Sequence, residues 1–447
     1  MTILVNTTIK IVLFLIVCTL PAAARIPNHR MYYRHDDRAP ITNLEIVFLG
    51  AGSNQEDHSK TGLATIVSKL IRNYSKKHGF TARLESLGTQ LEVRTYFPYQ
   101  TVSVSALSPN FEASVGIVND LIRNMAFADS VIDDAKKELQ TSYEKAAAFG
   151  SHRLVRNFAL ARTMGLNRIF SRESMKRITL EDIRQYHDRL LTTEVVFFKA
   201  ISDLDSMAIA RSLLPFTEFR QKGGFVRSPQ ARKPGGHPGH SAFVVDYYSH
   251  LKNVYSYWLI PCGTAGEDEF VPSIISTTLG TGPVSGLLYS YLRQECGLVY
   301  STSCSFRKSD DVRYLEIFAD PRLENSETLT EKLADYVIGL ADNPRFWETI
   351  AELRENPDFA NADSHEDLTP RRDLDNEVDI AIYDYPNREG GIKSVTDAEI
   401  RSFLERYFVE QNMVMLFYGP KDKITEILEK HWPEVEIHVL TTESTIE

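Results

Sequence analysis

The stretch ITLEDIRQYHDRLL, residues 178–191, has a counterpart further along the chain in VTDAEIRSFLERYF, residues 395–408. Each begins with a threonine that is followed three residues later by an acid, Asp182 in the first and Glu399 in the second, which is the pattern of a capped helix start. Apolar residues then recur at helical spacing, and a hydrophobic run follows each helix, VVFFKAIS and MVMLFYG. The sequence therefore predicts two copies of one helix–strand unit.

A second pair of segments has the same relation. EIVFLGAGSNQED, residues 45–57, and SYWLIPCGTAGED, residues 256–268, each run from a predicted strand into a glycine-containing turn and then acids. Because both pairs are separated by nearly the same number of residues, they indicate an internal duplication. Alternating strands such as QTVSVSAL, interspersed with long helical stretches, predict an α+β fold of two duplicated domains. Each domain is expected to be a largely antiparallel sheet packed against helices.

Composition shifts predict where these domains begin and end. Lys10, an apolar run over 11–20 and the segment PAAA before Arg25 are typical of a secretory signal peptide. Residues 220–240 are dense in Gly, Pro and basic residues, as linkers often are. The predicted segments are a signal peptide (1–24), an N-terminal domain (25–222), a linker (223–242), a C-terminal domain (243–436) and a tail (437–447).

Charge and cysteine content narrow the class of protein. The 447-residue chain carries a formal net charge of −10 and has no long basic cluster, which argues against a nucleic-acid partner. Beyond the signal segment only Cys262, Cys296 and Cys304 remain, too few for a disulfide scaffold, although one bridge among them is possible. The apolar run of the signal segment is too short to span a bilayer. We expect an exported protein, periplasmic or secreted, that is not membrane-bound after cleavage.

Three longer stretches, taken in order, resemble a known family, the pitrilysin/insulinase-type zinc peptidases. They are FLGAGSNQEDHSKTGLATIVSKLI, LESLGTQLEVRTYFPYQTVSVSAL and TLGTGPVSGLLYSYLRQECGLVYSTSCSF. The resemblance extends over nearly the whole mature chain and is greatest to the short, two-domain branch that includes mitochondrial processing peptidase. It implies a helix with the motif H-x-x-E-H, whose two histidines bind Zn²⁺ and whose glutamate takes a proton from the metal-bound water.

In this chain the three motif positions carry Thr65, Ser68 and Lys69 instead. The helix that holds them has Leu63, Ile66, Val67, Leu70 and Ile71 on one face, so we expect its polar residues on the opposite face. Hydroxyls are poor zinc ligands, and an ammonium group places a positive charge where the cation should lie. The resemblance implies a third, acidic ligand in DDAKKELQTSYEKAAA, at Ser142 or a neighbour, with Glu138 and Glu144 close by. The predicted metal site is degenerate, and no metal or other cofactor is expected in this chain.

The second half keeps the other part of the family's machinery. Arg293 and Tyr300 match the arginine and tyrosine that the family directs to its substrate. A guanidinium fork and a phenolic hydroxyl can both bind a peptide carbonyl or a developing oxyanion. From the pattern alone, a solvated helix arginine and an ordinary strand tyrosine remain the alternative.

These observations lead to three hypotheses about function. The first is a non-catalytic, substrate-binding subunit that supplies Arg293 and Tyr300 to a peptide-binding chamber, opposite a zinc-bearing homologous peptidase. The second is a stand-alone homodimer that binds or scaffolds extended peptides without cutting them. The third is an active zinc endopeptidase with unrecognised ligands, although His237 and His240 are interpreted as ordinary linker histidines.

Overall fold

The computed structural model describes residues 30–96, 99–127, 129–148, 151–165, 171–192, 196–218, 240–246, 253–264, 269–280, 286–309, 312–355, 391–441 and 443–446. The predicted signal peptide (1–24) and most of the predicted linker (223–242) lie outside the described residues.

Two mixed sheets with the same strand order form the fold. The first sheet runs β1 (Arg30–His35), β5 (Val196–Ser202), β2 (Ile41–Leu49), β4 (Tyr99–Leu107), β3 (Gln90–Thr95). The second runs β11 (Glu436–Leu440), β6 (Ser241–Asp246), β10 (Val414–Gly419), β7 (Tyr255–Thr264), β9 (Val312–Pro321), β8 (Val299–Ser309). In both sheets the first of the shared pairs, β1–β5 and β6–β10, is parallel and the others are antiparallel. The predicted α+β class and the duplication are confirmed, with β11 as an addition to the second sheet.

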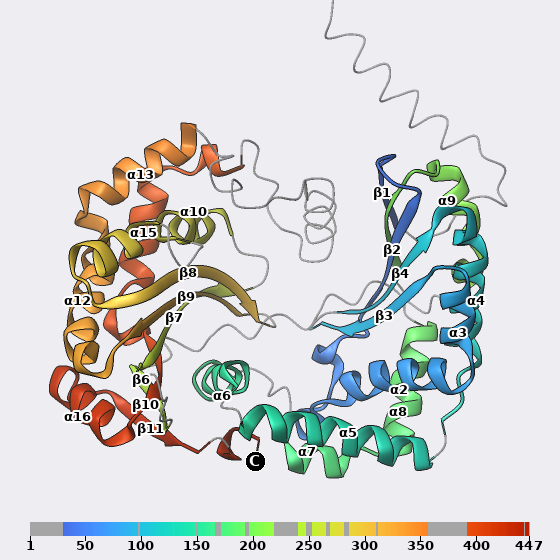
Figure 1. The fold of residues 1–447 in the computed structure, drawn as a ribbon, viewed down its shortest axis with the longest axis horizontal. Coiled ribbons are helices and arrows are strands. Elements are labelled where there is room, and N and C mark those ends of the chain that lie inside the picture. The colour runs from blue at the N-terminus through green and yellow to red at the C-terminus, as the bar shows by residue number, and fades with distance from the viewer. Residues whose placement is uncertain are drawn as a thin grey trace, which may run out of the picture.

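Helices cover the outer side of each sheet, so the opposite faces of the two sheets are turned toward the middle of the molecule (Figure 1). The first half contains α2 (Leu63–Lys77), α3 (Phe80–Ser86), α4 (Phe111–Asn124), α5 (Asp129–Ala148), α6 (His152–Met164), α7 (Arg172–Arg177), α8 (Leu180–Thr192) and α9 (Ser206–Ser212). The second half contains α10 (Phe270–Leu279), α11 (Gly286–Leu288), α12 (Ser326–Ile338), α13 (Pro344–Glu355), α15 (Asp397–Tyr407) and α16 (Lys421–His431).

The two predicted helix starts, at Thr179 and Thr396, are capped as predicted. The Thr396 hydroxyl accepts a bond from the Glu399 amide, and the Glu399 carboxylate accepts one from the Thr396 amide at 2.7 Å. Thr179 and Asp182 make the same reciprocal pair at the start of α8. These bonds satisfy amide groups that no helical carbonyl can reach, which fixes where each helix begins.

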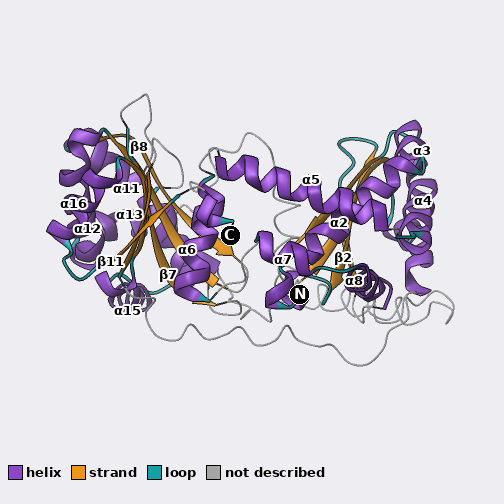
Figure 2. Cartoon of the chain, turned by 90° about the horizontal axis from the view of Figure 1, so that it is seen from below, coloured by secondary structure: helices purple, strands orange, loops and turns teal. Residues whose placement is uncertain are grey.

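The two halves exchange segments. Helix α6 belongs to the first half by sequence, yet its Val155, Ala159 and Leu160 pack on the second sheet, in a cluster that includes Phe243 and Leu416 (Figure 2). In the other direction, the end of the chain returns to the first half. Ile446 is buried in the first-half core, and its carbonyl accepts a 2.9 Å bond from the Arg172 amide.

Two of the predicted segments, the tail and the linker, contain residues that belong to the second sheet. Residues 437–447, assigned above to a tail, contain most of β11 and the 3₁₀ helix Glu443–Thr445. The last linker residues begin β6, whose first residue is Ser241. Hydrophobic spacing shows which side of an element is buried but not which half buries it, so the domain bounds given above stay predictions.

A buried charge cluster fixes α6 to the second sheet. Glu316 of β9 is only 6% exposed and lies 3.1 Å from both His152 Nε2 and a terminal nitrogen of Arg156. Arg307 of β8 approaches the same carboxylate at 3.3 Å. Burial alone would raise the pKa of Glu316, but the hydrogen bond from His152 and the charge of Arg156 outweigh it and bring this pKa to about 2.

Candidate functional site

Glu56 positions the helix that carries the degenerate motif. Its carboxylate accepts bonds from the Gly62 amide at 2.9 Å and the Ala64 amide at 2.6 Å, at the start of α2. A carboxylate is favourable there because it satisfies unpaired amides and meets the positive end of the helix dipole. Gly62 has φ +98°, a left-handed conformation that glycine adopts without strain. The acids after the turn were visible in the sequence, but not which of them would cap α2.

At the position of the motif glutamate, Ser68 makes structural contacts. It is 3% exposed, and its hydroxyl lies 2.7 Å from the Thr95 hydroxyl of β3 and accepts a bond from the side-chain Nε2 of Gln100 on β4. Thr95 and Gln100 also donate to the Ala64 carbonyl, at 3.1 and 3.2 Å. The expectation that the polar residues of α2 form one outward face is therefore wrong for Ser68, which is turned to the sheet.

At the last motif position, the Lys69 ammonium lies 2.6 Å from a carboxylate oxygen of Glu138 on α5. The side chain of Lys69 is 14% exposed, and Asn73 also donates to Glu138, at 3.4 Å. The hydrogen bond from Lys69 lowers the pKa of Glu138. Of the three positions considered for the third ligand, Glu138 is thus the one paired with α2, whereas Glu144 lies 3.2 Å from Arg172 and Ser142 is exposed.

This donor set does not fit zinc. A hydroxyl, Thr65, replaces one imidazole, and the fixed charge of Lys69 is paired with the carboxylate of Glu138. Within the part of the chain that the structure describes, no group of three or more His, Cys, Asp or Glu side chains is arranged to hold a metal ion. Lys69 thus places a tethered cation beside the carboxylate that a metal would need.

In the second half, the structure brings Arg293 and Tyr300 together. Arg293 is on the π-helix Tyr289–Glu295 and Tyr300 is on β8, and the guanidinium carbon lies 5.6 Å from the centre of the tyrosine ring. The Arg293 guanidinium also donates to the Val299 carbonyl at 2.9 Å. Tyr300 is 73% exposed, and its amide is held by Asp320 at 3.0 Å. Both residues are exposed to solvent.

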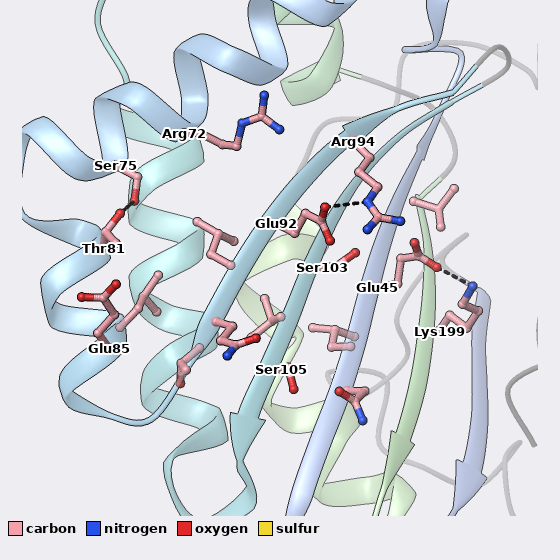
Figure 3. A pocket seen from close by; sticks show the side chains of 18 of the residues that line it. Glu45, Arg72, Ser75, Thr81, Glu85, Glu92, Arg94, Ser103, Ser105 and Lys199 are labelled. Atoms are coloured by element: carbon pink, nitrogen blue, oxygen red, sulfur yellow. Dashed lines mark hydrogen bonds and ion pairs between the residues drawn. The ribbon is translucent and has the colours of Figure 1, made fainter. Parts of the chain in front are cut away.

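Beside α2, a cavity of about 930 Å³ lies along the edge strand β3. Figure 3 shows its two walls, one formed by α2 and α3 with Arg72 and Glu85, and one formed by the open sheet face with Glu92 and Arg94. Its volume is in the range of ligand sites. The charges on the sheet wall are paired, Glu92 with Arg94 at 2.6 Å and Glu45 with Lys199.

The cysteines take no part in this site. Cys304 is fully buried, and burial raises the pKa of its thiol, as expected for a structural residue. None of Cys262, Cys296 and Cys304 is in a disulfide. Across the described residues, no helix has the length and apolar character needed to cross a membrane.

Comparison with known proteins matches part of the chain to the family that the sequence motifs resemble. Residues 30–171 match the model of the insulinase family, peptidase family M16. No curated protein matches the sequence significantly. The resemblance described above is confirmed for this segment, which contains the degenerate motif.

Solved structures of the same class share the fold over most of the chain. The inactive domain of an M16 peptidase from Pseudomonas fluorescens has a TM-score of 0.72 at 16% identity, covering 88% of this chain and 96% of that one. A protease from Helicobacter pylori has a TM-score of 0.67 at 14% identity, with coverages of 88% and 98%. The first half of the periplasmic protease PqqL from Escherichia coli has a TM-score of 0.67 at 14% identity, with coverages of 92% and 96%. The two-domain fold is therefore that of M16 peptidases.

Proposed function

We propose that this chain is the non-catalytic, substrate-binding partner of an exported zinc peptidase of the same fold. In this role it binds extended peptides, and Arg293 and Tyr300 contact the peptide in a chamber shared with a zinc-bearing homologous subunit. The observation that carries the proposal is the contrast between the two sites. Lys69 and Glu138 are ion-paired at the metal position, whereas Arg293 and Tyr300 lie together at the surface.

The first sheet supports the peptide-binding part of the proposal. Strand β3 is at the edge of its sheet, and edge strands offer amide and carbonyl groups with which an extended peptide can pair. The cavity beside it supplies the space. A relative described as an inactive domain and another described as the first half of a periplasmic protease are consistent with a chain that works beside a homologous one.

The test mixes the chain with a homologue from the same source that has an intact H-x-x-E-H motif. We expect the two to co-purify and the chain to stimulate peptide cleavage. Arg293→Ala and Tyr300→Phe should each lower turnover about a hundredfold, since one preorganised donor to an oxyanion contributes roughly 3 kcal/mol. Sedimentation should show association unchanged, and Arg293→Lys should restore only part of the rate.

Two results would contradict the proposal. If both substitutions leave cleavage unaltered although the wild-type chain stimulates, the roles of Arg293 and Tyr300 are wrong. If no such homologue is stimulated and the chain binds peptides as a pair of identical subunits, the scaffold hypothesis replaces it.

A further inference from the structure

Arg72 forms a hydrogen bond to the backbone of β3 on the free edge of this strand. The Tyr96 amide bonds to the Tyr99 carbonyl at 2.9 Å, so these two residues form a hydrogen-bonded pair of the β3–β4 hairpin. Antiparallel pairs alternate between hydrogen-bonded and non-hydrogen-bonded types. Counting back along the register, Val93 opposite Val102 is a non-hydrogen-bonded pair, so the amide and carbonyl of Val93 point away from β4. The Arg72 guanidinium donates to this outward carbonyl at 3.0 Å.

Arg72 uses only part of its hydrogen-bonding capacity there. A guanidinium has five N–H groups in a planar fork. Arg72 lines the cavity beside β3 (Figure 3). Among the described residues that line this cavity, Arg94 and Lys199 are in ion pairs, whereas no carboxylate lies within ion-pair distance of Arg72. The positive charge of Arg72 helps to lower the pKa of Glu138, but the Glu138 carboxylate is already paired with Lys69.

Because of this arrangement, the affinity for an extended peptide should depend on the charge that the peptide places beside Arg72. A neutral extended peptide that pairs with β3 must compete with Arg72 for the Val93 carbonyl. A peptide with a carboxylate beside that point offers the guanidinium a two-pronged, charge-assisted partner, which releases the carbonyl for the peptide backbone.

We propose that Arg72 is a movable cap on the edge of β3 that makes the site select extended peptides carrying an acidic side chain or terminal carboxylate opposite Val93. The inference rests on the proposed function, because it assumes that peptides bind along this edge.

The experiment measures binding of fluorescent, extended peptides to the full chain by anisotropy. The peptides form matched pairs that differ only by Glu or Gln, moved through each position in turn. At one position the wild-type chain should bind the Glu peptide about tenfold more tightly. Arg72→Ala should reduce this ratio to about one, with the Gln peptide bound as tightly as before or more so. Arg72→Lys should keep part of the ratio.

Lys76→Ala is the matched control, since Lys76 is one turn further along α2 and lines the same cavity. This variant should keep the ratio, and Arg72→Gln provides a second neutral substitution if the alanine variant folds poorly. A wild-type chain that binds both peptides equally, or a ratio that survives in Arg72→Ala or is lost equally in Lys76→Ala, overturns the role of Arg72 while peptide binding stands. Absence of binding by every peptide overturns both this inference and the proposed function.

Discussion

Helices α2 and α10 follow equivalent strands in the two halves, but one buried serine in each, Ser68 and Ser276, bonds differently. Ser276 of α10 donates to the Ser273 carbonyl of its own helix at 2.9 Å. Ser68 of α2 bonds to side chains of β3 and β4. The two serines are equally buried, at 4% and 3% exposure. At the place of the degenerate motif a side-chain hydroxyl thus links α2 to the sheet, whereas the Ser276 hydroxyl bonds only within α10.

A second difference concerns the sheet faces. The second sheet has α6 packed on the face opposite its own helices, with Glu316 buried at the contact. The corresponding face of the first sheet carries the paired charges Glu45–Lys199 and Glu92–Arg94 beside the cavity. The duplication thus kept the strand order and changed what each sheet contacts, and the following variants test which contacts matter.

The largest effect is expected from restoring a metal site in α2. In Thr65→His with Lys69→His, two imidazoles one turn apart face Glu138, which loses its ammonium partner. We expect one Zn²⁺ per chain by elemental analysis and, at zinc a thousandfold above Kd, a stabilisation of about 4 kcal/mol. Adding Glu138→Gln should weaken binding strongly. Tight stoichiometric zinc in the wild-type chain would show that its ligands were misidentified.

Next in size is Glu316→Gln, which removes the buried charge that holds α6. Breaking a buried ion pair leaves unpaired cations, so we expect a loss of about 3 kcal/mol in the free energy of unfolding at pH 7. Glu327→Gln is the control, since Glu327 pairs with Lys430 at the surface, where solvent screens the pair, and its loss should be much smaller than that of Glu316→Gln. Equal losses in the two variants would mean that the cluster does not hold α6.

The same residue predicts an acid dependence. The pKa of Glu316 is about 2 in the folded chain, against an ordinary value of 4.5, so its contribution is complete above about pH 4.5 and is lost as pH falls toward 2. Burial lowers the pKa of His152 in the folded chain. Because the unfolded chain then takes up this proton more readily, the free energy of unfolding also decreases as pH falls below 6.5. Urea unfolding between pH 7 and 3 should show a steeper decline for the wild-type chain than for Glu316→Gln. Parallel curves would refute it.

A smaller effect separates the two helices directly. Ser68→Ala removes a hydroxyl that bonds to both Thr95 and Gln100, and it should cost about 1 to 2 kcal/mol. Ser276→Ala removes a bond within its own helix and should cost about 0.5 kcal/mol. Chemical denaturation of both variants measures the difference. If the two losses are equal, the contacts of Ser68 are incidental.

The smallest change in stability is expected for Arg293→Ala. Tyr300 is 73% exposed and the guanidinium only stacks on it and bonds one carbonyl, so unfolding should shift by less than about 0.5 kcal/mol. A large loss of stability would indicate a structural role for Arg293 instead.

Local signals in the sequence were sufficient to predict the capped helices and the internal duplication. The capping pairs at Thr179 and Thr396 depend only on residues three apart, and both formed as predicted. The side of α2 to which Ser68 turns depended on Thr95 and Gln100, which spacing along the helix does not reveal. Glu138 could not be singled out because that requires the rotation of α5 relative to α2. The positions of α6 and Ile446 depend on contacts between the halves, for which a one-dimensional pattern carries no signal.

The exchange of segments also bears on how the chain is made. The core of the first half includes Ile446, which is synthesised long after strand β5 closes the first sheet. At translation rates of about 5 to 20 residues per second, the intervening residues take on the order of tens of seconds. During that time the first half has a gap in its core and α6 has no sheet to cover. The first-half core is therefore completed only when the second half returns Ile446 to it.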